Sequence, residues 1–244
     1  MKQEIEQILL ENGASMVGFA KIDELYSNVD LNGPRSGDSV TEPINIPNYP
    51  FGISIILAHP KDVIKNISNS PTMDYYDAYH RLNNKLDDLA IQCAEYIKEQ
   101  GYNAYPQTVL ATKEYGIFRT VMPHKTVAVH AGLGWIGKSA LFITEKYGSA
   151  VRLTSVLTDA PLEYNKQIMQ SKCGSCMLCT NACPGKAISG QIWNPELNRD
   201  DYFDAMACRK KAREIAAKTI DKQITLCGKC IEVCPYTRRY TLDI

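Results

Sequence analysis

The sequence lacks an excess of charge, because its 27 Lys and Arg residues are balanced by 27 Asp and Glu residues. We therefore expect no overall attraction to nucleic acid or to an anionic membrane, which argues against a general RNA-binding protein. The sequence also lacks an apolar run long enough to cross a bilayer. Glu4, Glu6 and Glu11 interrupt the N-terminal segment, so this segment does not have the apolar region of a signal peptide.

Cysteines, in contrast, are concentrated near the C-terminal end. The segment CGSCMLCTNACP contains Cys173, Cys176 and Cys179, with two residues between successive cysteines, and Cys183 follows just before Pro184. This spacing is typical of an iron–sulfur ligand run, in which three thiolates bind one 4Fe-4S cube and the last binds a second cube. The remaining cysteines of the region lie in a second run, CGKCIEVCP, and between the two runs: Cys227, Cys230, Cys234 and Cys208.

These eight cysteines are the number that two 4Fe-4S clusters with four thiolates each require. Since the last cysteine of each run crosses to the other cube, the first cluster is predicted to be held by Cys173, Cys176, Cys179 and Cys234. The second cluster is predicted to be held by Cys183, Cys208, Cys227 and Cys230. Structural zinc and a disulfide framework are the alternatives, but zinc needs no third cysteine at the next step and disulfide frameworks belong to short secreted chains. With its thiolates reserved for iron, the protein is expected in the reducing cytoplasm.

The rest of the chain, 244 residues long and 45% hydrophobic, alternates between helical and strand patterns. Residues 1–13 and 73–100 have the apolar spacing of amphipathic helices, and Cys93 falls on the apolar stripe of the second, which indicates a core thiol. The polar stretch 23–50 predicts a functional or wrapping loop. Apolar or β-branched runs predict three buried strands, over 15–20, 52–58 and 151–158.

These patterns predict an α/β (α+β) body over residues 1–165 and a C-terminal double-cluster 4Fe-4S ferredoxin-like module over residues 166–244. His59, at the end of the second strand, is interpreted as a buried histidine satisfied by backbone rather than as a site residue. A helix within 195–218 is predicted to carry Cys208 and four basic residues. These basic residues form either a solvated helix face or a docking patch for an acidic electron donor: Arg209, Lys210, Lys211 and Arg213.

A glycine-rich turn is the second informative stretch. The letters GLGWIG match the GxGxxG dinucleotide fingerprint, with glycines at Gly132, Gly134 and Gly137. That fingerprint requires a strand before it and a helix after it, whereas the preceding KTVAVHA favours a helix, so we discount the match. The glycines still indicate a close backbone approach or positive φ. Because Trp135 and Lys138 lie in the same turn, it is predicted to be a cofactor cradle.

The order of these pieces resembles the epoxyqueuosine reductase family, which is related to reductive dehalogenases. The matching segments are VGFA, YHRLNNKL, AGLGWIGK, GS followed by LTD, and both cysteine runs with Cys208 between them. The resemblance implies a base-off corrinoid, cobalamin, held between the body and the cluster module. Electrons from a low-potential donor such as ferredoxin or flavodoxin would pass through the cubes to cobalt. Backbone amides of the glycine turn would hold corrin side chains, and Lys138 would meet an anionic group on cofactor or substrate.

The sequence departs from this family in two places. The family has an aspartate before AGLGW that supplies a proton, and Thr120 is its nearest counterpart here. The nearby residues able to donate a proton are His124, His130 and Tyr115, of which His124 is preferred as the catalytic acid. The sequence also stops at Ile244, whereas the tRNA-modifying members continue into a helical-repeat domain. We therefore interpret the chain as a short relative and do not expect tRNA as its partner.

Three functions are consistent with the sequence. The first is a cobalamin-dependent reductase that acts on an unknown small-molecule substrate, with the clusters carrying its electrons. The second is an electron-transfer or reactivating protein for a corrinoid protein, without substrate turnover of its own. The third is a cluster-bearing binding module.

Overall fold

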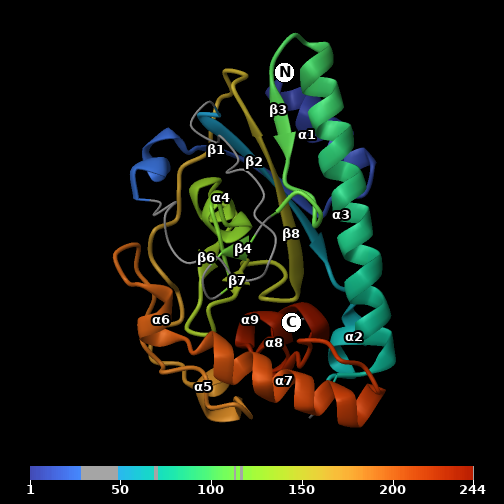
Figure 1. The fold of residues 1–244 in the computed structure, drawn as a ribbon, viewed down its shortest axis with the longest axis vertical. Coiled ribbons are helices and arrows are strands. Elements are labelled where there is room, and N and C mark those ends of the chain that lie inside the picture. Colours follow the sequence, from blue (N-terminus) through green and yellow to red (C-terminus); the bar gives the residue numbers. More distant parts are fainter. Residues whose placement is uncertain (29–48, 69–70, 113, 116–117, 244) are drawn as a thin grey trace. The chain divides into compact units, whose positions relative to one another are not determined.

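The computed structural model describes residues 1–28, 49–68, 71–112, 114–115 and 118–243 (Figure 1). The helices are α1 (Lys2–Glu11), α2 (Lys61–Lys65), α3 (Met73–Glu99), α4 (His124–His130), α5 (Leu178–Ala182), α6 (Arg199–Tyr202), α7 (Ala205–Ile220), α8 (Lys229–Glu232) and α9 (Pro235–Leu242), with a 3-10 helix η1 (Asp23–Asn28). The strands are β1 (Met16–Lys21), β2 (Phe51–Ala58), β3 (Ala104–Pro106), β4 (Glu114–Tyr115), β5 (Arg119–Thr120), β6 (Trp135–Ile136), β7 (Phe142–Ile143) and β8 (Val151–Thr158). The predicted mixed helix and strand fold is confirmed.

A four-stranded sheet in the order β1-β2-β8-β3 contains the three strands predicted from apolar runs. β1 pairs antiparallel with β2, and β3 pairs antiparallel with β8. The two central strands are largely buried, which explains why their sequences are rich in β-branched residues rather than alternating. β3, β4 and β5 lie in the stretch 101–122, where the sequence shows no periodicity, because strands of two or three residues are too short to have one.

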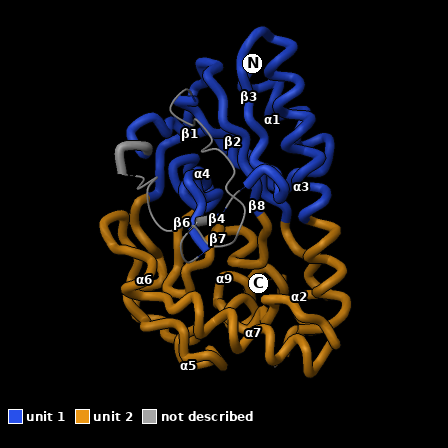
Figure 2. Tube along the Cα trace, in the orientation of Figure 1, with its two compact units in different colours: residues 1–57, 83–133, 153–168 blue, residues 58–82, 134–152, 169–244 orange. Residues whose placement is uncertain are grey.

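The chain divides into two compact units, each made of three separate segments (Figure 2). Unit 1 comprises residues 1–57, 83–133 and 153–168, and unit 2 comprises residues 58–82, 134–152 and 169–244. Unit 2 therefore combines the cysteine-rich region with two segments from the predicted body. The division into folding domains at residue 165 stays a prediction.

In unit 1, α4 packs on β1, and two strand glycines allow the close approach of the segment around this helix. A Cβ on Gly18 would lie 2.7 Å from Leu133 Cγ, and one on Gly52 would lie 2.8 Å from Val127 Cγ1. Glycine in a strand often marks such an approach. The helix α4 confirms the helical interpretation of KTVAVHA. Because a helix precedes the glycine turn and the strand β6 lies within it, the order of elements does not match the dinucleotide fingerprint. Cys93 also lies in unit 1 and is 2% exposed, as expected of a core thiol.

In unit 2, α2, the start of α3 and α8 share one hydrophobic cluster that includes Ile67, Tyr75 and Ile231. Gly228 adopts positive φ beside this cluster, where a Cβ would lie 2.9 Å from Ile67 Cδ1 and 3.0 Å from Tyr75 Cε1. This glycine lies between two of the predicted ligand cysteines, so the core of unit 2 constrains the second cysteine run directly.

The predicted loop and the expected lack of a membrane span can also be compared with the structure. Most of the predicted loop 23–50 lies outside the described residues, and its first part forms η1. Across the described ranges, no helix combines the length and the apolar character that a membrane span requires.

Candidate metal centre

Both cysteine runs form the same local structure in unit 2. Each run wraps a short helix, α5 or α8, and each places its last cysteine within two residues of the end of that helix and directly before a proline: Cys183 and Cys234. α5 and α8 pack against each other. The residue before proline is restricted to extended backbone, and Cys183 and Cys234 both have extended φ and ψ. This geometry directs the last cysteine of each run away from its own helix.

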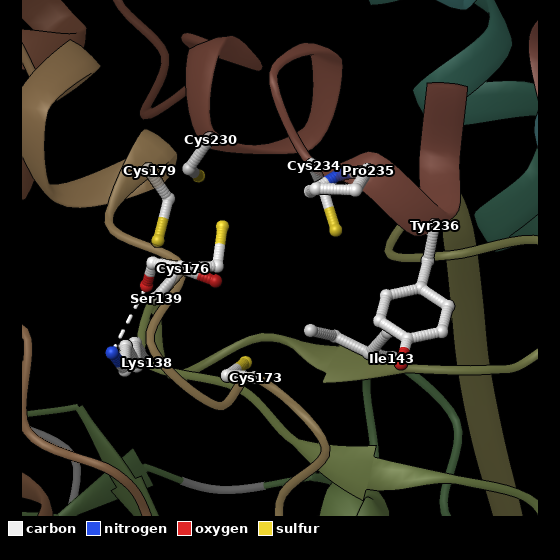
Figure 3. A pocket seen from close by; sticks show the side chains of 10 residues that line it. All are labelled: Lys138, Ser139, Ile143, Cys173, Cys176, Cys179, Cys230, Cys234, Pro235 and Tyr236. Atoms are coloured by element: carbon white, nitrogen blue, oxygen red, sulfur yellow. Dashed lines mark hydrogen bonds between the residues drawn. The ribbon is translucent and has the colours of Figure 1, made fainter. Parts of the chain in front are cut away.

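One cavity in unit 2 is bordered by Cys173, Cys176, Cys179, Cys230 and Cys234 (Figure 3). In Figure 3 the sulfur atoms of four of these, all except Cys230, surround the centre of the cavity. They are the four cysteines that the spacing predicts for the first cluster. The cavity is completed by Lys138, Ser139, Ile143, Pro235 and Tyr236.

The thiols of this first group interact electrostatically. Burial raises the pKa of Cys179, and the neighbouring Cys173, Cys234 and Cys176 raise it further. Burial likewise raises the pKa of Cys234, against the lowering effect of backbone N–H groups of Tyr236 and Thr237 that bond its sulfur. Those amides belong to the first turn of α9, where backbone N–H groups have no partner within the helix.

The other four cysteines form a second group. Burial raises the pKa of Cys208, on α7, to about 11, and the nearby Cys183 and Cys227 contribute. Burial raises the pKa of Cys230 well above its ordinary value, and the two largest charge contributions come from Cys208 and Cys227. The Cys183 sulfur also accepts a bond of 3.4 Å from the backbone N–H of Ala187. Cys230 also borders the cavity of the first group and interacts with Cys179. The division of the eight thiols into two ligand sets of four stays a prediction.

The chemistry of this donor set fits iron–sulfur clusters. All nine cysteines of the chain are described, and all are free thiols. Among the predicted ligands, burial raises the pKa of Cys179, Cys208, Cys227, Cys230 and Cys234, so these five thiols hold their protons near neutral pH. Iron binding must release those protons, and the positive charge of iron must drive the release. Within the described ranges, no three or more His, Cys, Asp or Glu side chains converge where a single metal ion could be held.

The glycine turn makes the close contacts that its sequence predicts, and the contacts are with the chain itself. A Cβ on Gly134 would lie 2.1 Å from the Ile143 carbonyl oxygen, and one on Gly137 would lie 2.4 Å from Ile143 Cδ1 and 3.4 Å from Cys173 Sγ. Within unit 1, Gly132 has positive φ and a Cβ there would lie 2.4 Å from the Lys166 carbonyl oxygen. These approaches account for the three glycines without a ligand.

The two large side chains of the turn point into unit 2. Trp135 is 1% exposed, and its ring packs edge-on against Tyr236 with centroids 4.9 Å apart. Lys138 is 4% exposed, and its Nζ donates a 2.9 Å hydrogen bond to the Cys176 carbonyl oxygen. Because their own chain buries both side chains, neither offers a surface to a corrin ring in this arrangement. The cradle role of Gly132, Gly134, Trp135, Gly137 and Lys138 stays a prediction.

The preferred proton donor, His124, is the first residue of α4 and is half-buried. Its Nδ1 lies 2.7 Å from Ser155 Oγ, which also accepts a 2.8 Å hydrogen bond from Gln107 Nε2. Gln107 and Ser155 are both buried, so they hold the imidazole in one orientation. Sequence reasoning missed this pair, although Ser155 is a hydroxyl residue in the middle of a strand predicted to be buried. The other two candidate proton donors are His130, the last residue of α4, and Tyr115, in β4.

The surroundings of His59 correct the interpretation of this residue as a buried histidine satisfied by backbone. Its backbone is satisfied, since its N–H donates to the Ala150 carbonyl and its carbonyl accepts from the Tyr240 hydroxyl. Its side chain is not, because Nδ1 is buried and has no hydrogen-bond partner among the described residues. Burial lowers the pKa of His59 to about 3, and the charges of Arg152 and Arg81 lower it further. The imidazole is therefore neutral in the folded protein.

Comparison with known proteins agrees with this description. Residues 172–237 match the family described as the 4Fe-4S double cluster binding domain. The chain is 26% identical to the epoxyqueuosine reductases of Lactococcus garvieae and Bacillus subtilis, over 98% of its own length and over 70% and 64% of theirs. It thus spans about two thirds of the length of these curated relatives.

Two solved structures share the fold. A catabolic reductive dehalogenase matches 98% of this chain with a TM-score of 0.73 at 19% identity, and the match covers 32% of that protein. An epoxyqueuosine reductase solved with a tRNA stem loop matches 97% of this chain with a TM-score of 0.59 at 23% identity, and the match covers 65% of that protein. These two structures show the fold, and the sequence matches show an epoxyqueuosine reductase-like iron–sulfur protein with a C-terminal 4Fe-4S double cluster binding domain.

Proposed function

We propose that the protein is an oxidoreductase that passes electrons through two 4Fe-4S clusters to a corrinoid, which reduces an unknown small-molecule substrate. The observation that carries the proposal is that both cysteine runs and Cys208 lie in unit 2, where the sulfur atoms of Cys173, Cys176, Cys179 and Cys234 surround one cavity. The first group would hold one cluster and the second group the other. Each cluster carries one electron, whereas a corrinoid supplies two-electron reduction, so the two kinds of cofactor complement each other.

The electron donor in this proposal is a low-potential protein such as ferredoxin or flavodoxin. Unit 2 contains eighteen Lys and Arg residues but only twelve Asp and Glu residues, although the whole chain is balanced. Lys210 and Lys218 are exposed on α7, the helix that carries Cys208. An acidic donor would be attracted to this side of unit 2, one helix diameter or roughly 10 Å from the second group of thiols.

The proposed proton donor is His124. The chain from Gln107 through Ser155 to His124 holds the imidazole in place, and a histidine can donate a proton near neutral pH. A general acid must be positioned before its pKa matters, and this histidine is positioned by two buried groups. The same chemistry requires a reducing compartment for the thiols, so the cytoplasm is the proposed location.

A second function has a specific observation in its favour. Trp135 and Lys138, the side chains expected to contact the corrinoid, are buried within unit 2. This favours the alternative in which the clusters deliver electrons to a corrinoid held by a partner protein, without substrate turnover by this chain. tRNA is not proposed as a substrate in either case, because the chain has no net positive charge to attract it.

Anaerobic purification with iron, sulfide and cobalt analysis tests both functions. The protein is incubated with hydroxocobalamin, the excess is removed, and a visible spectrum is recorded. About eight irons per chain with stoichiometric cobalt supports the corrinoid reductase. About eight irons without retained cobalt supports the electron-transfer alternative. A protein that binds no iron under these conditions contradicts both.

A further inference from the structure

Lys138 is one of the few charged side chains that the structure buries almost completely. It is 4% exposed and borders the cavity of the first thiol group, together with Cys173, Cys176 and Cys179 (Figure 3). Lysine is rarely buried without a partner, because transfer of an ammonium out of water costs free energy that an opposite charge or hydrogen bonds must offset. The position of this ammonium therefore needs an explanation.

The protein contacts of Lys138 offset only part of that cost. Its Nζ donates to the Cys176 carbonyl oxygen at 2.9 Å and approaches Met177 Sδ at 3.5 Å. Both partners are neutral, and in the described part of the chain no carboxylate forms an ion pair with this ammonium. The charge that would balance it is that of a thiolate-ligated cube in the adjoining cavity, which is net negative.

The distance is short enough for a direct effect. The carbonyl oxygen and the sulfur of one cysteine are separated by only four bonds, so the ammonium lies within roughly 8 Å of Cys176 Sγ. Reduction adds a negative charge to a cube, and a fixed positive charge at this distance in a buried site stabilises the reduced form.

A lysine also acts on the second thiol group, but this lysine is paired. Burial raises the pKa of Cys227, and the charge of Lys229 lowers it. The Nζ of Lys229 is paired with Glu232 at 2.9 Å, and Glu232 also accepts from Arg238, so the charge of Lys229 is partly compensated by a carboxylate, whereas that of Lys138 is not among the residues that the structure describes. The two cubes, although both ligated by four cysteines, would lie in different electrostatic environments.

We propose that Lys138 is the buried counter-charge of the first cluster and that it raises the reduction potential of this cluster above that of the second. An electron that arrives at either cube then collects at the cube held by Cys173, Cys176, Cys179 and Cys234. That cube adjoins the glycine turn, since Gly137 lies in contact with Cys173. The inference rests on the proposed function only in requiring that both clusters are bound.

The test is a redox titration of the anaerobic holoprotein, followed by the EPR signals of the reduced clusters. Lys138→Gln removes the charge and keeps a hydrogen-bond donor, Lys138→Arg keeps the charge, and Lys65→Gln removes an exposed charge on α2 as the matched control. We expect Lys138→Gln to lower the reduced-to-oxidised ratio of one cluster at least tenfold at a fixed potential, equivalent to about 59 mV for a one-electron couple. The Arg and Lys65 variants should titrate as the parent does.

A second measurement does not depend on the stability of Lys138 variants. Cys208→Ala, which should keep only the first cluster, is expected to titrate at the higher of the two parent midpoints. Unchanged midpoints in Lys138→Gln with full iron content, or a remaining cluster in Cys208→Ala that titrates at the lower midpoint, would overturn the inference. A parent protein without two clusters would instead contradict the proposed function.

Discussion

Cys208→Ala is the sharpest test of the ligand assignment, because Cys208 is the one predicted ligand outside both cysteine runs. It lies on α7, and its thiol interacts with Cys183 and Cys227. If these residues hold one cube together, removal of one thiol should leave that cube incomplete and the other intact. The iron content is therefore expected to fall from about eight to about four per chain, or by one iron if the cube converts to a three-iron form.

The fold should survive this change. Cys208 is only half-buried, and deletion of a sulfur atom costs about 1–2 kcal/mol even in a core. Domains of this kind are stable by about 5–15 kcal/mol, so the variant should remain folded. Cys93→Ala is the matched control, because Cys93 is 2% exposed and burial raises its pKa to about 12.

The assay is iron and sulfide analysis of both variants after anaerobic purification, with circular dichroism to confirm folding. The control should keep about eight irons despite the more deeply buried position of its cysteine. A Cys208→Ala protein with two complete four-iron clusters would show that the ligand scheme is wrong. A loss of iron in Cys93→Ala would refute its interpretation as a core thiol.

Two further predictions concern stability. Gly134→Ala should lower the free energy of unfolding by about 3 kcal/mol or more, because the new Cβ meets a backbone oxygen at 2.1 Å. Gly13→Ala, at a glycine with positive φ but open space around it, should lower it by about 1 kcal/mol in the same anaerobic urea titration. Equal losses would contradict the close-approach interpretation. His59 has a folded pKa below its unfolded value, so the unfolded chain binds the extra proton and stability should fall as pH decreases from about 6.5 toward 3. In urea titrations at pH 7.5 and 5.5, His59→Phe should show a smaller pH dependence than the parent, and an unchanged dependence would argue against a buried neutral imidazole.

Much of this protein follows from local sequence. The β-branched run 151–158 predicts a strand with the bounds that β8 has, and Cys93 lies in the core as its place on an apolar helical stripe predicts. Helices and strands of this length have a periodicity that a single segment shows by itself. Cysteine spacing is equally local, because a short run must wrap around one cube, and this spacing by itself indicates an iron–sulfur protein.

Other features depend on contacts between distant segments. The sequence identifies Lys138 as part of a glycine turn, but only the fold shows that its ammonium reaches the Cys176 carbonyl, 38 residues away. The same holds for Ser155 beside His124, and for the unpartnered Nδ1 of His59. No local pattern encodes such pairs, because burial and hydrogen bonding across a fold depend on where every other segment packs. The sequence alone therefore determined which residues bind iron in the proposal, whereas tertiary structure decided which charges and hydrogen bonds surround them.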